Sequence, residues 1–134
     1  MTGEQAFNAA SALMGEYRPE EENYDLMGFK RSAVQVINVI AAELDGLDCD
    51  LKKIDPDSDS HVHAKIASLS DEIPLHELIT DALLPLGMCY MFLSEENPVR
   101  ADFFLKKYLA LLEDLRRRYS RTRRHPIKNV YGAL

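Results

Sequence analysis

The feature that most constrains the fold is the spacing of apolar residues between positions 26 and 47. They recur at steps of three and four, which places them along one side of an α-helix: Leu26, Phe29, Ala33, Val36, Ile37, Ile40, Leu44 and Leu47. The opposite side carries polar residues: Arg31, Gln35 and Asn38. Either Asn23 or Asp25 can cap this helix, and Asp45-Gly46 predicts its end. The segment therefore predicts an amphipathic helix that has to bury one face.

Helical spacing also appears at the start of the chain. A helix is predicted from about Gly3 to Met14, with Thr2 as its N-cap and Gly15 as its end. Its apolar side consists of Phe7, Ala10 and Met14. The acidic stretch over residues 17–23 contains a proline and is interpreted as a connector.

The last predicted helix has a clear start, with Asn97 as N-cap and Pro98 at the first helical position. Its core stripe consists of Ala101, Phe104, Leu105, Tyr108, Leu112, Leu115 and Tyr119. Phe103 points away from this stripe, so it is a candidate for an exposed aromatic residue that contacts another subunit.

The predicted helix from His76 to Leu93 is apolar almost all round, and Pro85 is expected to kink it. One stripe consists of Leu75, Leu78, Ile79, Ala82, Leu86, Cys89 and Leu93; a second lies on the far side, at Leu84, Met88 and Met91. A bundle helix needs only one apolar face. The second stripe therefore predicts either a central buried helix or a contact with another subunit.

No strand pattern and no internal repeat interrupts these segments. The sequence predicts an all-α fold, a single-domain bundle of about four helices over residues 1–134. Its core covers about 3–119, a long loop joins the second and third helices, and an extended basic tail covers 120–134.

Residues 48–68 are low in apolar content and are interpreted as that loop. Asp55, Asp57 and Asp59 have the two-residue steps of a calcium loop, but the sixth position is Ser60 and the twelfth is Ile66 instead of glycine and glutamate. His61 and His63 have no Cys-x-x-Cys or His-Glu-x-x-His motif beside them to complete a transition-metal site. We therefore expect no metal here, and a mobile loop over 48–65.

The sequence predicts no enzyme and no cofactor, because it has neither a recognisable nucleophile arrangement nor a phosphate-binding glycine loop. Cys49 and Cys89 lie in unrelated contexts, which favours reduced thiols. The start of the chain does not have the pattern of a signal peptide. The longest apolar run, 82–93, is too short to span a bilayer, so no membrane contact is expected.

Charge is strongly polarised along the chain. From Ala101 onward there are nine Lys or Arg and three Asp or Glu, a balance of +6, whereas residues 1–100 have a balance of −12. The strongest cluster comprises Arg116, Arg117, Arg118, Arg121, Arg123 and Arg124. It can solubilise a helix end, contact phosphates or meet an acidic partner surface. The net charge of −6 argues against a dedicated DNA-binding domain.

After Pro126 the tail is apolar and aromatic, with Ile127, Val130 and Tyr131. It is either an unstructured end or an extended segment that docks on a partner.

The order of these segments resembles that of the small helical head–tail connector (adaptor or head-completion) proteins of long-tailed bacteriophages and their prophage relatives. The matching stretches are Ala6-Phe7-Asn8-Ala9-Ala10, Val36-Ile37-Asn38, Ala42-Glu43-Leu44, Leu69-Ser70-Asp71-Glu72-Ile73, Leu84-Pro85-Leu86-Gly87-Met88, Asn97-Pro98-Val99-Arg100-Ala101-Asp102-Phe103-Phe104 with Tyr108, and Ile127-Lys128-Asn129-Val130-Tyr131-Gly132. The 48–65 loop and the arginine density over 116–124 depart from the family pattern.

The resemblance implies a non-enzymatic virion structural protein that docks on the portal ring and extends the DNA channel toward the tail. Its expected partners are the portal protein, the next neck or tail protein and copies of itself in a ring, with non-specific contact with DNA. It would be found in the host-cell cytoplasm during assembly and then in the virion neck. The arginine cluster and the tail residues Ile127, Val130 and Tyr131 are the expected partner-binding residues. The alternatives are a small helical DNA-binding or regulatory protein that uses the basic end of the last helix, and a helical accessory subunit of an enzyme.

Overall fold

The computed structural model describes residues 1–16 and 26–119, and within these ranges it is an all-α single-domain bundle without strands. The elements are α1 (Gly3–Glu16), α2 (Leu26–Glu43), α3 (Asp45–Ile54), a π-helical turn η1 (Ile79–Leu83), α4 (Leu84–Leu93) and α5 (Pro98–Tyr119). The predicted fold class is confirmed, with five α-helices in place of about four. None of the described helices is both long enough and apolar enough to cross a membrane.

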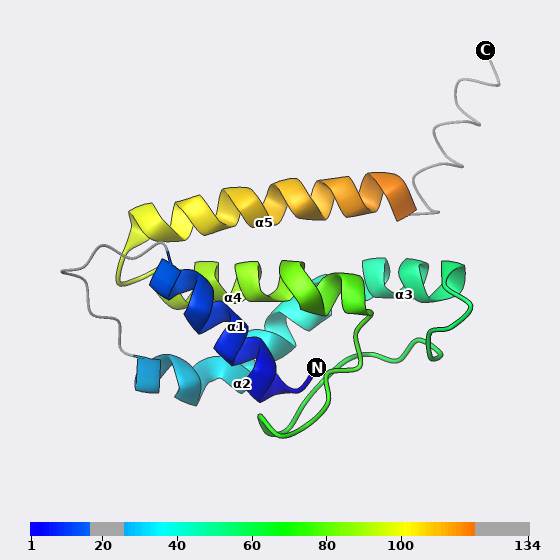
Figure 1. Cartoon of the computed structure of the whole chain (residues 1–134), viewed down its shortest axis with the longest axis horizontal. Coiled ribbons are helices and arrows are strands. Elements are labelled where there is room, and N and C mark those ends of the chain that lie inside the picture. The colour runs from blue at the N-terminus through cyan, green and yellow to red at the C-terminus, as the bar shows by residue number, and fades with distance from the viewer. Residues whose placement is uncertain (17–25, 120–134) are drawn as a thin grey trace, which may run out of the picture.

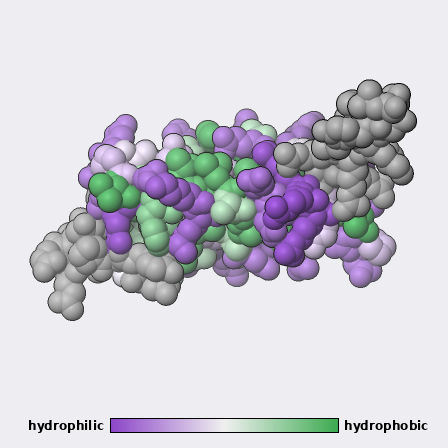
Figure 2. All heavy atoms as spheres, turned by 90° about the horizontal axis from the view of Figure 1, so that it is seen from above, coloured by the Kyte–Doolittle hydropathy of each residue, from purple (hydrophilic) through white to green (hydrophobic). Residues whose placement is uncertain are grey.

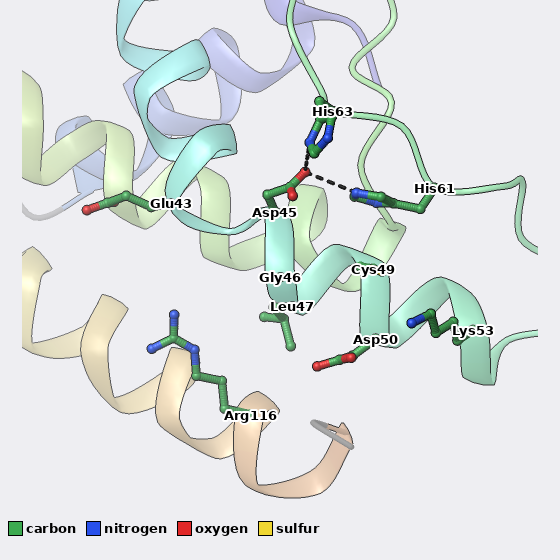
Figure 3. Close-up of a pocket in the computed structure, with 10 residues that line it drawn as sticks. All are labelled: Glu43, Asp45, Gly46, Leu47, Cys49, Asp50, Lys53, His61, His63 and Arg116. Atoms are coloured by element: carbon green, nitrogen blue, oxygen red, sulfur yellow. Dashed lines mark hydrogen bonds and ion pairs between the residues drawn. The ribbon is translucent and has the colours of Figure 1, made fainter. Parts of the chain in front are cut away.

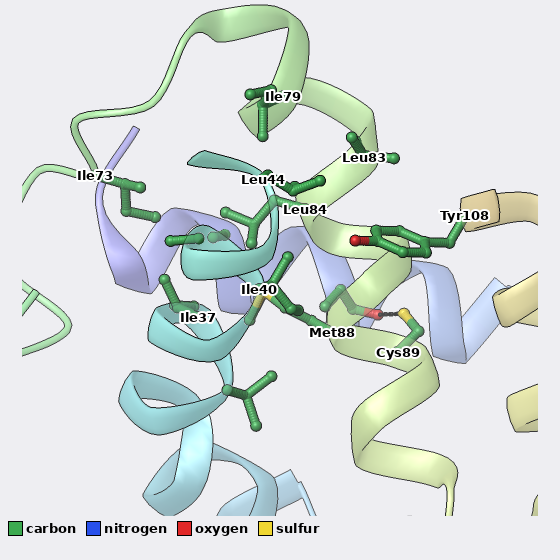
Figure 4. Packing of buried hydrophobic residues seen from close by; sticks show 14 of the residues in the cluster. Ile37, Ile40, Leu44, Ile73, Ile79, Leu83, Leu84, Met88, Cys89 and Tyr108 are labelled. Atoms are coloured by element: carbon green, nitrogen blue, oxygen red, sulfur yellow. Dashed lines mark hydrogen bonds between the residues drawn. The ribbon is translucent and has the colours of Figure 1, made fainter. Parts of the chain in front are cut away.

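Helix α4 lies at the centre of the bundle (Figure 1), with α5 along one side and α1 and α2 on the others. Leu84, Met88, Cys89 and Leu93 have no solvent-exposed surface. Gly87 allows α2 and α5 to approach α4 closely, since a Cβ there would lie 3.1 Å from both the Ile40 and the Tyr108 side chains. Figure 4 shows side chains of α2 and α5 packed around α4. Of the two interpretations of its apolar surface, the central buried helix is confirmed.

The prediction that Leu84 and Met88 contact another subunit is wrong, because both side chains are buried inside this chain. Met91, the third member of that predicted face, is only half-buried. The error has a physical cause: a helix that is covered on several sides by its own chain needs apolar residues all round, and the sequence pattern is the same for a subunit contact.

Pro85 is accommodated by the π-helical turn before it. The N–H of Leu84 donates to the carbonyl of Ile79, five residues back. Proline has no N–H, and its ring collides with the carbonyl four residues earlier in an α-helix. A wider π-turn relieves such a collision. The predicted disturbance at Pro85 therefore takes the form of a change in helix type.

The start of α1 is tied to the segment 69–73. Thr2 and Gln5 form a capping box, in which the Gln5 N–H donates to Thr2 Oγ1 at 3.2 Å and the Thr2 N–H donates to Gln5 Oε1 at 2.9 Å. The N–H groups of Gly3 and Glu4 donate to the carbonyls of Asp71 and Leu69. The first N–H groups of α1, which have no partner within a helix, are thus all satisfied. Thr2 is confirmed as the cap.

The predicted loop over 48–65 is wrong in its first part, because α3 continues to Ile54. Leu47 and Leu51 are four residues apart and both are buried, which gives this helix a narrow apolar face. Acidic residues in its first turn and lysines in its last turn interact favourably with the helix dipole and stabilise the helix. Sequence reasoning missed α3 because only two of its four apolar residues are buried, so the apolar face is too narrow to stand out from the polar residues around it.

The chain that follows this loop lies against α2. Asn38 of α2 donates to the carbonyl of Ile66 at 2.9 Å and accepts from its N–H at 2.8 Å. Asp71 accepts hydrogen bonds from the N–H groups of Ala67 and Ser68. Asn38 therefore does not simply face solvent, and the segment has a defined path against α2.

Helix α5 follows the prediction closely. The Arg100 N–H donates to Asn97 Oδ1 at 3.2 Å, which confirms the cap. The core stripe is buried or half-buried throughout, and Phe103 is exposed. Cys49 and Cys89 are free thiols, as expected. Burial raises the pKa of Cys89 to about 12, and its thiol donates to the carbonyl of Ala10.

Two stretches of the predictions lie outside the described residues. They are the connector over 17–23 and the tail over 120–134 with Arg121, Arg123, Arg124, Ile127, Val130 and Tyr131.

The neighbouring phenylalanines of α5 provide a test of this core. Phe104 is fully buried, so we expect Phe104→Ala to lower the free energy of unfolding by about 3–5 kcal/mol, the usual cost of a large core truncation. Phe103→Ala is the matched control and should cost far less. Chemical denaturation of both variants measures the difference. Equal losses would contradict the orientation of α5.

Candidate functional site

A groove with apolar walls lies between α2, α4 and α5. Its volume is about 340 Å³, and its residues are Val39, Ile40, Glu43, Gly87, Tyr90, Met91, Ser94, Leu105, Tyr108 and Leu109. Val39 and Leu109 are each 50% exposed on its rim, although both are large apolar residues. In Figure 2, seen from the α5 side, apolar residues are visible in the middle of the face, among hydrophilic ones. The groove is therefore an apolar surface that this chain leaves partly uncovered.

Glu43 connects this groove to a second depression. That depression has a volume of about 490 Å³, and its lining includes Glu43, Asp45, Asp50, His61, His63 and Arg116 (Figure 3). Glu43 also accepts a hydrogen bond of 3.4 Å from the Tyr108 hydroxyl. Burial, and then the negative charge of Glu43, raise the pKa of Tyr108 to about 12. The apolar groove and the charged depression thus form one continuous surface.

The basic end of α5 belongs partly to this surface. Arg116 lines the charged depression, opposite Asp50 and Glu43. Arg117 Nη2 lies 3.1 Å and Arg118 Nε 3.3 Å from Asp114 Oδ1. All three arginines are exposed. Arg117 and Arg118 therefore pair with an acidic residue of their own helix, and Arg116 shares the depression with Asp50 and Glu43.

Among the predicted subunit contacts, the two that remain accessible are on different faces. Phe103 is 36% exposed on the outer side of α5, where the Lys107 ammonium lies 5.1 Å from the centre of its ring. Met91 lines the groove. The exposed residues Val39 and Leu109, which sequence reasoning did not select, contribute more to the accessible apolar surface than Met91 does. Their spacing within otherwise polar helix faces was the signal that could have identified them.

A buried carboxylate organises the other side of α3. Asp48 has no exposed surface, and its Oδ2 lies 3.0 Å from Lys52 Nζ and 2.9 Å from His61 Nδ1. Its Oδ1 accepts from the N–H of His76 at 2.7 Å. A buried charge is tolerated when it is paired and fully hydrogen-bonded. Asp48 therefore ties three segments together: α3, the loop at 61 and the chain just before η1.

His76 extends this network to Asp55. Its Nε2 donates to Asp55 Oδ2 at 2.8 Å, and its Nδ1 accepts from the N–H of Leu78 at 3.1 Å. The hydrogen bond from His76, followed by one from the N–H of Asp57, lowers the pKa of Asp55. A lowered carboxyl pKa stabilises the folded state above the usual pKa of aspartate, and this contribution is lost as the pH falls through the lowered value.

A candidate metal site lies at the start of α3. Among the described residues, one group of three or more His, Cys, Asp or Glu side chains has its ligand atoms close enough together to hold a metal ion: Asp45, His61 and His63. Asp45 Oδ1 lies 3.1 Å from His61 Nε2 and 3.0 Å from His63 Nδ1. Sequence reasoning considered both histidines and missed Asp45, because it placed that residue at a helix end and sought partners only in known motifs. The calcium-loop aspartates are not brought together in this group.

In comparisons with known proteins, no family model, no curated protein and no solved structure matches the chain.

The Asp48 network can be tested on two adjacent lysines. Lys52→Ala removes the cation beside a fully buried carboxylate and should lower the free energy of unfolding by about 3–5 kcal/mol. The exposed Lys53 is the control, and Lys53→Ala should leave stability nearly unchanged. Urea denaturation at pH 7 measures both variants. A Lys52 variant as stable as the Lys53 variant would contradict the role of Asp48.

Proposed function

We propose that the chain is a non-enzymatic virion structural protein, a head–tail connector subunit that docks on a portal ring and extends the DNA channel toward the tail. The observation that carries the proposal is the continuous surface formed by the apolar groove and the charged depression at Arg116. An uncovered apolar surface with a charged border is typical of a protein contact.

The resemblance to phage connectors supports the same proposal. Several of its segments occupy positions on which the bundle depends. The carbonyls of Leu69 and Asp71 accept hydrogen bonds from the first N–H groups of α1. Gly87 permits the close packing of α4, and Asn97 caps α5. These are positions that a shared fold would need.

The groove is the contact that we assign to copies of the chain or to the portal. Its exposed rim comes from α2 and α5, through Val39 and Leu109. Arg116 and the tail after it would contribute the charged part of the docking surface. Localisation in the host-cell cytoplasm during assembly and then in the virion neck follows from this role.

The alternative is a small helical DNA-binding or regulatory protein that uses the basic end of α5. Arg117 and Arg118 each lie beside Asp114, so their charge is partly compensated within the chain. The overall charge of −6 also argues against a dedicated DNA-binding domain. The connector is therefore the function that the surface favours.

Two exposed apolar residues of α5 provide a matched test. Leu109→Glu places a charge on the groove rim, whereas Val99→Glu places one on an 81% exposed position outside the groove. We expect the first variant to reduce capture by the portal protein encoded in the same genome by about tenfold or more, since an interface charge without a partner costs more than about 1.4 kcal/mol. The second variant should be captured like the unmodified protein.

Capture by immobilised portal and binding to duplex DNA are measured in parallel over a salt series, with circular dichroism to confirm folding. Equal capture of both variants would argue against the groove. Tight, salt-sensitive DNA binding that Arg116→Ala weakens, without portal capture, would replace the connector proposal with the DNA-binding alternative.

A further inference from the structure

We propose that Asp45, His61 and His63 form a binding site for a divalent transition metal ion of the Zn²⁺ type, which fastens the loop after α3 to the start of that helix. This inference is independent of the proposed connector function, because it rests on the geometry of three side chains and their supporting residues.

The three ligand atoms are already grouped around one point. Asp45 Oδ1 lies 3.1 Å from His61 Nε2 and 3.0 Å from His63 Nδ1, and all three atoms lie within 4.8 Å of one another. In a tetrahedral Zn²⁺ site with bonds of about 2.0–2.1 Å, adjacent ligand atoms are about 3.3 Å apart. The two distances from Asp45 Oδ1 are therefore already close to those of a tetrahedral site, and an ion would be bound after the side chains adjust around it. Figure 3 shows both imidazole rings directed at the Asp45 carboxylate.

The ring of His61 lies between the carboxylates of Asp48 and Asp45. The Asp48 carboxylate accepts from Lys52 and from the His76 N–H, and it meets His61 through Nδ1 at 2.9 Å. Nδ1 must then carry a hydrogen. In a neutral ring, Nε2 consequently has a lone pair that points at an oxygen of Asp45, also a lone-pair atom, only 3.1 Å away. A metal ion bound by both atoms would use these two lone pairs.

The surroundings favour a metal ion at this position. A metal-binding histidine usually donates its other ring N–H to a carboxylate, which fixes the ring and raises its basicity. Asp48 provides that carboxylate for His61, and it is fully buried and held by Lys52. His61 is thus oriented by a rigid partner, while Asp45 and His63 approach from the helix start and from the loop. Asp48 is a positioning residue in this arrangement.

Two nitrogen ligands and one oxygen ligand select the class of ion. Imidazole suits Zn²⁺, Co²⁺, Ni²⁺ and Cu²⁺, whereas Ca²⁺ and Mg²⁺ prefer a full set of oxygen ligands. The site opens into the depression of about 490 Å³. His63 is 90% exposed and His61 is 21% exposed, so a water molecule can take the fourth position.

Titration calorimetry of the full chain with ZnCl₂ at pH 7.5 tests the proposal. We expect one ion per chain, a higher melting temperature with Zn²⁺, and no such response to CaCl₂ or MgCl₂. His63→Ala, His61→Ala and Asp45→Asn should each weaken binding by about tenfold or more and remove the thermal shift. His63→Ala is the most informative variant, since its ring is 90% exposed and its contacts with His61 and Asp45 lie within the site.

Two variants control for adventitious binding: His125→Ala, at a histidine that is not among the three ligands, and Asp59→Asn in the same loop. Both should bind Zn²⁺ like the unmodified chain. Co²⁺ adds a spectroscopic readout, because a tetrahedral ion gives strong visible absorption that His63→Ala should abolish. The proposal is overturned if Zn²⁺ produces no saturable heat, or if binding survives in His61→Ala and His63→Ala, or if it disappears in His125→Ala.

Discussion

The enclosure of α4 is the constraint on which the rest of this structure depends. A ten-residue helix that is apolar on nearly every side has to be covered by other elements, and α1, α2 and α5 provide that cover. Gly87 lets α2 and α5 approach closely, and the π-helical turn before Pro85 accommodates the proline at the start of the helix. Because α4 is almost fully enclosed, the apolar surface that remains accessible to partners lies on other helices, at Val39 of α2 and Leu109 of α5.

A second, polar centre holds the segments that the apolar core does not. Asp48 is buried together with the lysine that neutralises it, and it fixes both His61 and the backbone of His76. Through these contacts the long connection after α3 is anchored at two points. A loop fixed in this way can present His63 beside Asp45, which unstructured chain could not do. The metal site that we propose therefore depends on a carboxylate that would not touch the ion.

Helices with strong local signals could be predicted from the sequence alone. The stripe of α2 from Phe29 to Ile40, the Asn97-Pro98 start of α5 and the Thr2 cap of α1 are all encoded within a few residues, and each is confirmed. The two ends of the predicted stripe were wrong, because Leu26 is exposed and Leu47 belongs to α3. The features that were missed depend on distant partners. Helix α3 is stabilised mainly by burial of Leu47 and Leu51, and Asp45 meets histidines sixteen and eighteen positions away only after the chain has folded. Likewise, the pattern of Leu84 and Met88 could not distinguish a buried core from a subunit contact.

Amide hydrogen exchange, compared between the free chain and the chain bound to portal, tests the central claim most directly. The account predicts that amides of α4 exchange slowest in the free chain, because the helix is enclosed on several sides. On binding, it predicts new protection in the segments that carry the groove rim, around Val39 and Leu109, with little change around Val99. Rapid exchange in α4, or protection on binding that appears only around Val99 and Phe103, would contradict it.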